Sequence, residues 1–162
     1  MIIKEINEIE VKEIVEVLKQ GGLVIVPTET LYGALVDATN PKAVEKLTQY
    51  KNRPLGKPFS VAVAGQEMAE EYVYLNQNAK NLYKTFLPGP VTVISKGKHK
   101  VTKGIESESG TLGIRIPDYK LVLEIVKKLR KPVTATSANA SYKKKPYKIS
   151  DILDNLSTKQ KI

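Results

Sequence analysis

Short runs of branched apolar residues alternate along this chain with segments whose apolar residues recur at helical spacing. Residues 23–26 and 59–64 are typical of strands, whereas residues 11–18 and 121–129 carry an apolar stripe typical of helices. Because helices and strands alternate, the pattern predicts an α/β fold, with an open mixed sheet flanked by helices. No repeat or linker divides the 162 residues, so we expect a single domain over 1–162, with 149–162 as a weakly defined tail.

Boundary residues refine this prediction. A capping box of Asn7 and Glu10 is expected to start the first helix, which ends at a double glycine. Residues 23–26 are short, branched and wholly apolar, which predicts a central strand covered on both faces. Asn40 followed by proline predicts the N-cap of a second helix. The other expected elements are strands at 91–95, 112–116 and 133–135 and helices at 78–87 and 150–156.

Several classes of function are disfavoured by what the sequence lacks. No stretch approaches the roughly 18 apolar residues that span a bilayer, and the first residues do not resemble a signal peptide. We therefore expect a cytoplasmic protein without membrane contact. Cysteine is absent, which excludes disulfides, thiol nucleophiles and cysteine-based zinc sites. The single histidine, His99, lies among lysines, which makes it a poor metal ligand and a poor general base.

The formal net charge of +9 predicts an anionic partner. Nucleotide phosphates and RNA both fit this charge, and a solvated lysine-rich surface is an equally good interpretation. Much of the excess lies in three lysine clusters. These are Lys96, Lys98, Lys100 and Lys103, then Lys127, Lys128, Arg130 and Lys131, and finally Lys143, Lys144, Lys145 and Lys148.

Two polar segments, 27–33 and 134–139, each directly follow a strand signal. In α/β sheets, ligands usually bind beyond the carboxyl ends of strands. Hydroxyl and amide groups there suit an amino acid or a phosphoryl oxygen, and they also cap turns and strand ends. Ser137 has neither a histidine nearby in sequence nor nucleophile-elbow glycines, so we interpret these groups as recognition groups. They are Thr28, Thr30, Thr111, Thr134, Thr136, Ser137 and Asn139.

Basic residues offer a second kind of binding group. The chain has no Gly-x-x-x-x-Gly-Lys-Ser/Thr loop and no Gly-x-Gly-x-x-Gly turn. Lys51, Arg53 and Lys57 instead place three cations at the exit of a predicted helix, stiffened by prolines at 54 and 58. They fit a phosphate-binding loop, and a solvated charged surface is the alternative.

Arg115 lies within an apolar predicted strand, where an unpaired buried guanidinium would be unstable. Two interpretations stay open. Arg115 forms an ion pair with Glu29 or another carboxylate, or it grips the carboxylate of a substrate with two hydrogen bonds.

Five motifs, taken in order, carry a resemblance to a known family. They lie at 27–33, 51–58, 87–92, 111–117 and 134–139. Together they resemble the YrdC-like threonylcarbamoyl-AMP synthase family, over about residues 7–141. The resemblance implies a YrdC-like twisted open sheet around a positively charged cavity. It also implies a nucleotidyltransferase that makes threonylcarbamoyl-adenylate from L-threonine, bicarbonate and ATP and releases pyrophosphate. A partner transferase then passes the threonylcarbamoyl group to adenosine 37 of tRNA.

The resemblance also implies residue roles. Threonine would be bound by Thr28, Thr30, Tyr32, Arg115 and Ala135. The nucleotide would be bound by Lys51, Arg53, Lys57, Thr111, Ser137 and Asn139. Lys51 and Arg53 would be catalytic, because adenylation needs charge neutralisation and alignment more than a protein nucleophile. Magnesium is expected on the ATP phosphates, and no residue is assigned as a metal ligand.

The sequence departs from the family pattern in three places. Ala62 stands where many members have histidine, and a lysine-rich stretch at 142–147 replaces a glycine turn. The sequence ends at Ile162, before the family's usual later strand, so we expect a short form of the domain. Two alternatives therefore stay open. One is a non-catalytic RNA-binding module that contacts tRNA or double-stranded RNA, and the other is a related carbamoyl-adenylate enzyme with another acceptor.

Overall fold

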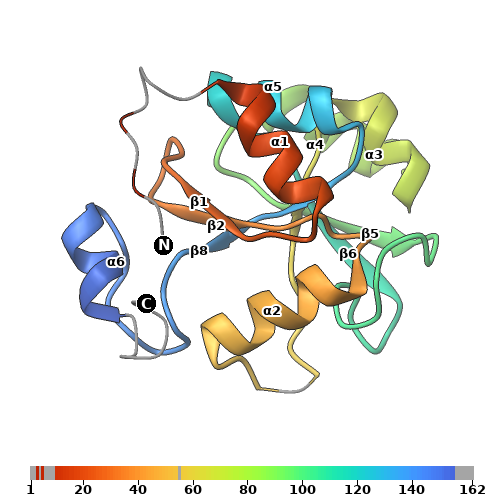
Figure 1. The fold of residues 1–162 in the computed structure, drawn as a ribbon. Coiled ribbons are helices and arrows are strands. Elements are labelled where there is room, and N and C mark those ends of the chain that lie inside the picture. Colours follow the sequence, from red (N-terminus) through yellow and green to blue (C-terminus); the bar gives the residue numbers. More distant parts are fainter. Residues whose placement is uncertain (1–2, 4, 6–9, 55, 156–162) are drawn as a thin grey trace.

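The computed structural model describes residues 3, 5, 10–54 and 56–155. Its elements follow one another as a mixture of short strands and helices (Figure 1). The helices are α1 (Val11–Lys19), α2 (Pro41–Lys51), α3 (Gln66–Tyr72), α4 (Gln77–Phe86), α5 (Lys120–Leu129) and α6 (Ile149–Asn155). The strands are β1 (Val24–Val26), β2 (Gly33–Leu35), β3 (Val61–Ala62), β4 (Val73–Tyr74), β5 (Val93–Gly97), β6 (Thr111–Arg115), β7 (Val133–Thr134) and β8 (Thr136–Ser137).

The strands form two sheets. A three-stranded antiparallel sheet has the order β1-β2-β8, and a five-stranded mixed sheet has the order β4-β5-β6-β3-β7. In the mixed sheet β3 runs parallel to β6 and antiparallel to β7. Because Ala135 alone separates β7 from β8, the chain passes from one sheet to the other within a single residue. The second predicted polar segment therefore begins where the two sheets meet.

Helices cover the strands on more than one side. In Figure 1, α1 and α5 lie side by side over one side of the strands, and α2 lies on the other side. Val15 of α1 and Val126 of α5 belong to one buried apolar cluster, whereas Leu47 of α2 and Ile114 of β6 belong to another. The predicted α/β class, with open mixed strands flanked by helices, is confirmed.

The structure confirms the predicted start of the second helix. Pro41 is the first residue of α2, and the Asn40 side chain accepts hydrogen bonds from the backbone N–H groups of Lys42 and Ala43. Leu47 is fully buried on the inner face. For α1 the helix itself is confirmed, but Asn7 of the predicted capping box lies outside the described residues. Glu10 occupies the N-cap position without a side-chain cap hydrogen bond.

The prediction that residues 23–26 form a central strand is wrong. β1 is the edge strand of the three-stranded sheet, and Val24 and Ile25 are only half-buried. The apolar run has a different cause. Val24 and Val26 pack against the cluster of α1 and α5, while Leu23 and Ile25 pack against the other cluster. Both faces therefore meet apolar side chains, although one lateral edge is unpaired by any strand among the described residues.

Several short elements were not predicted. These are α3, β2, β4 and β8, of which the three strands have only two or three residues each. Such short strands show too little alternation to be recognised in a sequence. The strands expected at 91–95 and 112–116 are present as β5 and β6, displaced by one or two residues. The helix expected at 150–156 is present as α6, apart from Leu156, which lies outside the described residues. In the described part of the chain, no helix is long and apolar enough to cross a bilayer.

Candidate functional site

A small cavity of about 80 Å³ lies where the two sheets meet. Its wall is built from the segment after β1, from β2, β3 and α5, from the end of β6 and from the residues around β8. The lining residues are Thr28, Glu29, Thr30, Leu31, Gly33, Leu35, Ala62, Arg115, Pro117, Val122, Ala135, Thr136 and Ser137. Four of the five residues implied to bind threonine line it, so the structure brings most of that set together.

The segment after β1 is shaped by its own hydroxyl groups. Thr28 Oγ1 donates its proton to the Leu31 carbonyl at 2.7 Å and accepts the N–H of Thr30 at 3.2 Å. A hydroxyl has one proton, so Thr30 must be the donor in the 3.1 Å contact between the two threonine hydroxyls. Thr30 Oγ1 therefore offers the cavity its acceptor lone pairs.

Arg115 and Glu29 form an ion pair on the cavity wall. Arg115 Nη2 donates to Glu29 Oε1 at 2.7 Å, and Arg115 Nε donates to the Gly89 carbonyl at 3.2 Å. Glu29 Oε1 also accepts the N–H of Asp118 at 3.0 Å, whereas Glu29 Oε2 is buried without a hydrogen-bond partner among the described residues. The ion-pair interpretation of Arg115 is thus confirmed. Arg115 Nη1 makes no hydrogen bond in the described part of the chain, and binding of a substrate carboxylate stays a prediction.

Lys51, the last residue of α2, connects the basic motif to the second polar segment. Its side chain is buried, with 2% exposure, and Nζ donates to the Ser137 carbonyl and, at 2.7 Å, to the Asn139 carbonyl. The Lys51 carbonyl in turn accepts the N–H of Ser141 at 2.7 Å. Burial, assisted by the charge of Arg53, lowers the pKa of Lys51 to about 8. An ammonium has three protons, so one remains for an anion.

Arg53 and Lys57 hold the loop that follows α2. The Arg53 guanidinium donates to the Pro58 carbonyl and, through Nε at 3.1 Å, to the Lys57 carbonyl. Its carbon Cζ lies 4.2 Å from the centroid of the Phe59 ring. Burial lowers the pKa of Arg53, and the nearby Tyr142 hydroxyl partly offsets this. Lys57 Nζ reaches the Tyr142 hydroxyl at 3.2 Å. These cations lie outside the cavity lining, so the predicted positive charge of the cavity stays a prediction.

Thr111 is not brought to the cavity. It begins β6, whereas Arg115 ends that strand, and four residues of strand span about 13 Å. Its hydroxyl instead lies 2.7 Å from the Ser107 hydroxyl. The loop before Thr111 does approach the basic motif, because a Cβ atom added to Gly56 would lie 3.1 Å from Glu108 Oε1. Thr111 therefore lies at the end of β6 that faces the loop after α2, away from the small cavity.

Tyr32 and Asn139 also lie outside the cavity lining. Tyr32 is half-buried, and its N–H donates to the Pro146 carbonyl at 2.9 Å. Asn139 is buried, and its Nδ2 donates to the Lys143 carbonyl at 2.8 Å. Asn139 Oδ1 is buried with no hydrogen-bond partner in the described part of the chain. Both residues thus attach the lysine-rich segment to the site.

Sequence reasoning missed several wall residues. Gly33 and Leu35 share one face of β2, and a Cβ added to Gly33 would lie 3.3 Å from Thr28 Cγ2. Ala62 is buried and also lines the cavity, so this position takes up little space there. Alternation places Gly33 and Leu35 on one face of β2, but a strand of three residues is too short to be recognised in the sequence. No sequence signal points to Tyr142, because its contact with Lys57 joins residues far apart in the chain.

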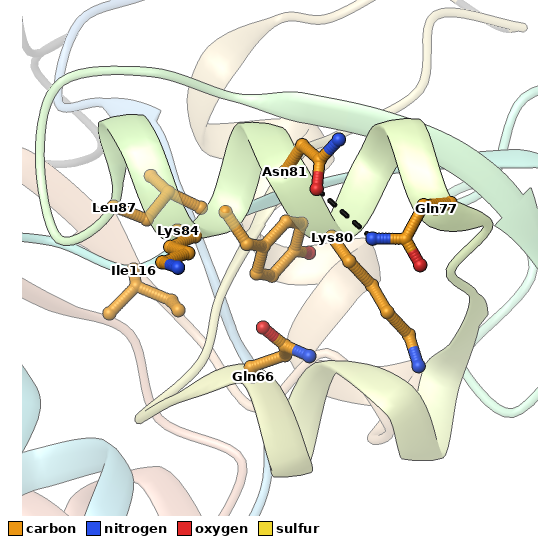
Figure 2. A pocket seen from close by; sticks show the side chains of 8 residues that line it. Gln66, Gln77, Lys80, Asn81, Lys84, Leu87 and Ile116 are labelled. Carbon is orange, nitrogen blue, oxygen red and sulfur yellow. Dashed lines mark hydrogen bonds between the residues drawn. The ribbon is translucent and has the colours of Figure 1, made fainter.

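A larger cavity of about 480 Å³ lies between α3 and α4 and contains none of the predicted site residues. Figure 2 shows Gln66 projecting from α3 toward α4 side chains that include Gln77 and Lys80. Tyr83 also lines this cavity, and its hydroxyl is buried without a partner among the described residues. Ile116 lines this cavity, whereas its neighbour Arg115 lines the smaller one, so the two cavities lie on opposite sides of the chain there.

Comparisons with known proteins agree with one another. The Sua5/YciO/YrdC family model, described as "Telomere recombination", matches residues 16–162. The threonylcarbamoyl-AMP synthase of Bacillus subtilis is 33% identical over 93% of this chain and 44% of that protein. A relative from Methanocaldococcus jannaschii, named for the same activity, is 40% identical over 93% of this chain and 72% of its own length. The structure of Pyrococcus abyssi Sua5 complexed with L-threonine matches 93% of this chain and 44% of that one, with a TM-score of 0.86 and 28% identity.

Proposed function

This chain belongs to the Sua5/YciO/YrdC family, and on that premise we propose that it makes threonylcarbamoyl-adenylate from L-threonine, bicarbonate and ATP. The chain spans less than half of the Bacillus subtilis and Pyrococcus abyssi proteins, so the activity is proposed from the part that they share. The observation that carries the proposal is the small cavity. Four of the residues implied for threonine line it, in a fold that matches a Sua5 complexed with that amino acid.

The ion pair on the cavity wall suits the two charges of an amino acid. A carboxylate can bind Arg115 Nη1, which has no hydrogen bond among the described residues. The ammonium group next to that carboxylate can donate to Glu29 Oε2, the buried oxygen without a partner. Thr30 Oγ1 can accept a further hydrogen bond, such as one from the threonine hydroxyl. We therefore assign threonine to this cavity.

The basic residues supply what the second half of the reaction requires. The threonine ammonium first loses one proton to solvent. The free amine nitrogen then bonds to the carbon of bicarbonate, and water leaves to give a carbamate. Its oxygen bonds to the α-phosphorus of ATP, the bond from that phosphorus to the bridging oxygen breaks, and pyrophosphate leaves. Lys51, Arg53 and Lys57 would balance the phosphate charge, and Lys51 carries its proton below pH about 8.

Magnesium is expected to arrive as the ATP complex. In the described part of the chain no three acidic or histidine side chains cluster closely enough to hold a metal ion. Magnesium commonly keeps several waters and binds substrate phosphates with few protein ligands. The phosphate oxygens would therefore be its main ligands, in keeping with a site built from cations and hydroxyls.

The product implies a protein partner and a tRNA. A threonylcarbamoyl-adenylate needs a transferase that moves its acyl group to the tRNA adenosine. The lysine clusters offer a surface for tRNA or double-stranded RNA, although Lys131 and Lys144 are paired with Asp37 and Asp151. Retention on RNA that falls steeply as salt rises would support this contact, and no retention at low salt would exclude it.

The test of the activity is pyrophosphate release from ATP with magnesium. We expect release only when L-threonine and bicarbonate are both present, with Arg115→Lys losing activity and Lys42→Ala, an exposed position of α2, keeping it. Threonine-independent release, or full activity in Arg115→Lys, would contradict the proposal.

A second candidate, a carbamoyl-adenylate enzyme with another acceptor, is favoured by one observation. Ala62 lines the cavity where many family members carry histidine, and the smaller side chain leaves more room beside Arg115. Release of pyrophosphate with a different amino acid in place of threonine would support that candidate. Strict dependence on threonine would exclude it.

A further inference from the structure

Tyr142 occupies a backbone position that disfavours any side chain. The N–H of Lys143 donates to the Ala140 carbonyl at 3.1 Å, which closes a turn over residues 140–143. Tyr142 is the third residue of this turn and has a φ of 64°. A positive φ at that position is the mark of a type II turn, where glycine is preferred because Cβ crowds the backbone. A tyrosine here is strained, and such strain is concentrated at functional sites.

Core packing does not account for this tyrosine. Tyr142 is 85% exposed to solvent. The ring contacts the basic motif: Lys57 Nζ lies 4.8 Å from the ring centroid and 3.2 Å from the hydroxyl oxygen. The ammonium can cover one side of the ring at most, so the remainder is open to solvent.

The turn that carries the ring is nevertheless held in place. Just before Tyr142 in the chain, the Ser141 N–H donates to the Lys51 carbonyl at 2.7 Å. On the other side, Asn139 Nδ2 donates to the Lys143 carbonyl at 2.8 Å. These bonds join the turn to the end of α2 and to the second polar segment. The turn therefore presents an exposed aromatic ring beside Lys57 of the basic motif.

We propose that Tyr142 forms the base-binding platform of the nucleotide site, on which the adenine ring of ATP stacks. This inference rests on the proposed function. An aromatic ring binds a base through its π-face, and Lys57, whose ammonium lies over the ring, is positioned for the phosphates of the same nucleotide. The exposure, the fixed turn and the cation at one side distinguish Tyr142 from Tyr147, which is also exposed and for which no ring contact is recorded in the described residues.

The test compares two probes that differ by the base. ATP and inorganic tripolyphosphate, each with magnesium, are titrated calorimetrically into wild type and into Tyr142→Phe, Tyr142→Ala and Tyr142→Gly. Tyr147→Ala is the matched control. We expect Tyr142→Ala and Tyr142→Gly to weaken ATP binding by about ten-fold, with tripolyphosphate binding unchanged. Tyr142→Phe, which keeps the ring, and Tyr147→Ala should bind ATP as wild type does.

The glycine variant separates loss of the ring from loss of the fold. Glycine relieves the strain of the positive φ, so Tyr142→Gly should melt no lower than wild type while it binds ATP more weakly. Equal ATP binding in all variants would overturn the inference, and so would a parallel loss of tripolyphosphate binding, which would indicate a structural role.

Two further outcomes separate this inference from the proposed function. If wild type binds neither probe, the proposed function and the platform fail together. If wild type binds ATP and releases pyrophosphate but Tyr142→Ala does so equally well, only the platform fails. Weaker retention of single-stranded RNA by Tyr142→Ala, with ATP binding unchanged, would overturn the ATP platform in favour of an RNA base.

Discussion

The stability of the fold should rise with pH between about 7.5 and 9.5 because of Lys51. Its pKa is lowered from 10.5 to about 8 in the folded protein, chiefly by burial. Between these two values the unfolded chain binds more protons than the folded one, so the free energy of unfolding increases as pH rises. Lys51 is only 2% exposed, so solvent screens its charge little. The expected gain from pH 7.5 to 9.5 is about 2 kcal/mol.

The assay is urea unfolding of wild type and Lys51→Met at half-unit steps across this range. Methionine keeps much of the length of the side chain and cannot titrate, so subtracting its curve isolates the Lys51 contribution. Lys42→Met, exposed on the same helix, is the control and should follow wild type. The pH range of the assay ends below pH 10 because of Tyr50. Burial raises the pKa of Tyr50 to about 12, so above pH 10 the unfolded chain loses this proton first and the free energy of unfolding falls. Parallel curves for wild type and Lys51→Met would refute the reasoning.

Three other changes test the packing and the site. Tyr83→Phe removes a buried hydroxyl that has no partner among the described residues, so urea unfolding should show a gain of about 1 kcal/mol; a loss would reveal a hidden partner. Thr134→Val leaves the Val36 N–H and the Ala34 carbonyl without their buried partner, and the same assay should show a loss of about 3 kcal/mol, whereas no loss would show that the strands readjust. Glu29→Gln weakens the hold on a substrate ammonium, so the KM for threonine should rise about ten-fold while the KM for ATP is unchanged; equal rises would place Glu29 outside the threonine site.

Local signals predicted the helices better than the strands. Asn40 followed by Pro41 marks a helix start through bonds made within a few residues, and the structure has those bonds. The position of β1 in its sheet depends instead on which strand lies beside it, and that is decided by residues far along the chain. Apolar clusters on both faces produced the same residue pattern as a central strand would.

The candidate site shows the same division. The motifs indicated which segments meet, and Thr28, Arg115 and Ser137 do line one cavity. The sequence could not show that the Lys51 ammonium binds two backbone carbonyls, because that depends on how α2 ends against the second polar segment. It also could not reveal the turn that displays Tyr142, since lysine-rich stretches without apolar periodicity are read as solvated surface.

A single residue, Ala135, separates β7 from β8, so the cavity lies directly at the junction of the two sheets. Ala135 links the sheet of β1, β2 and β8 to the sheet that contains β3, β6 and β7. Its N–H donates to the Ser60 carbonyl at 2.8 Å. Thr30, in the segment between β1 and β2, and Arg115, the last residue of β6, both line the cavity, so a rotation of one sheet against the other would change the space between them. An amino acid that contacts both Thr30 and Arg115 would therefore restrain the two sheets together, and amide hydrogen exchange would slow in both sheets at once.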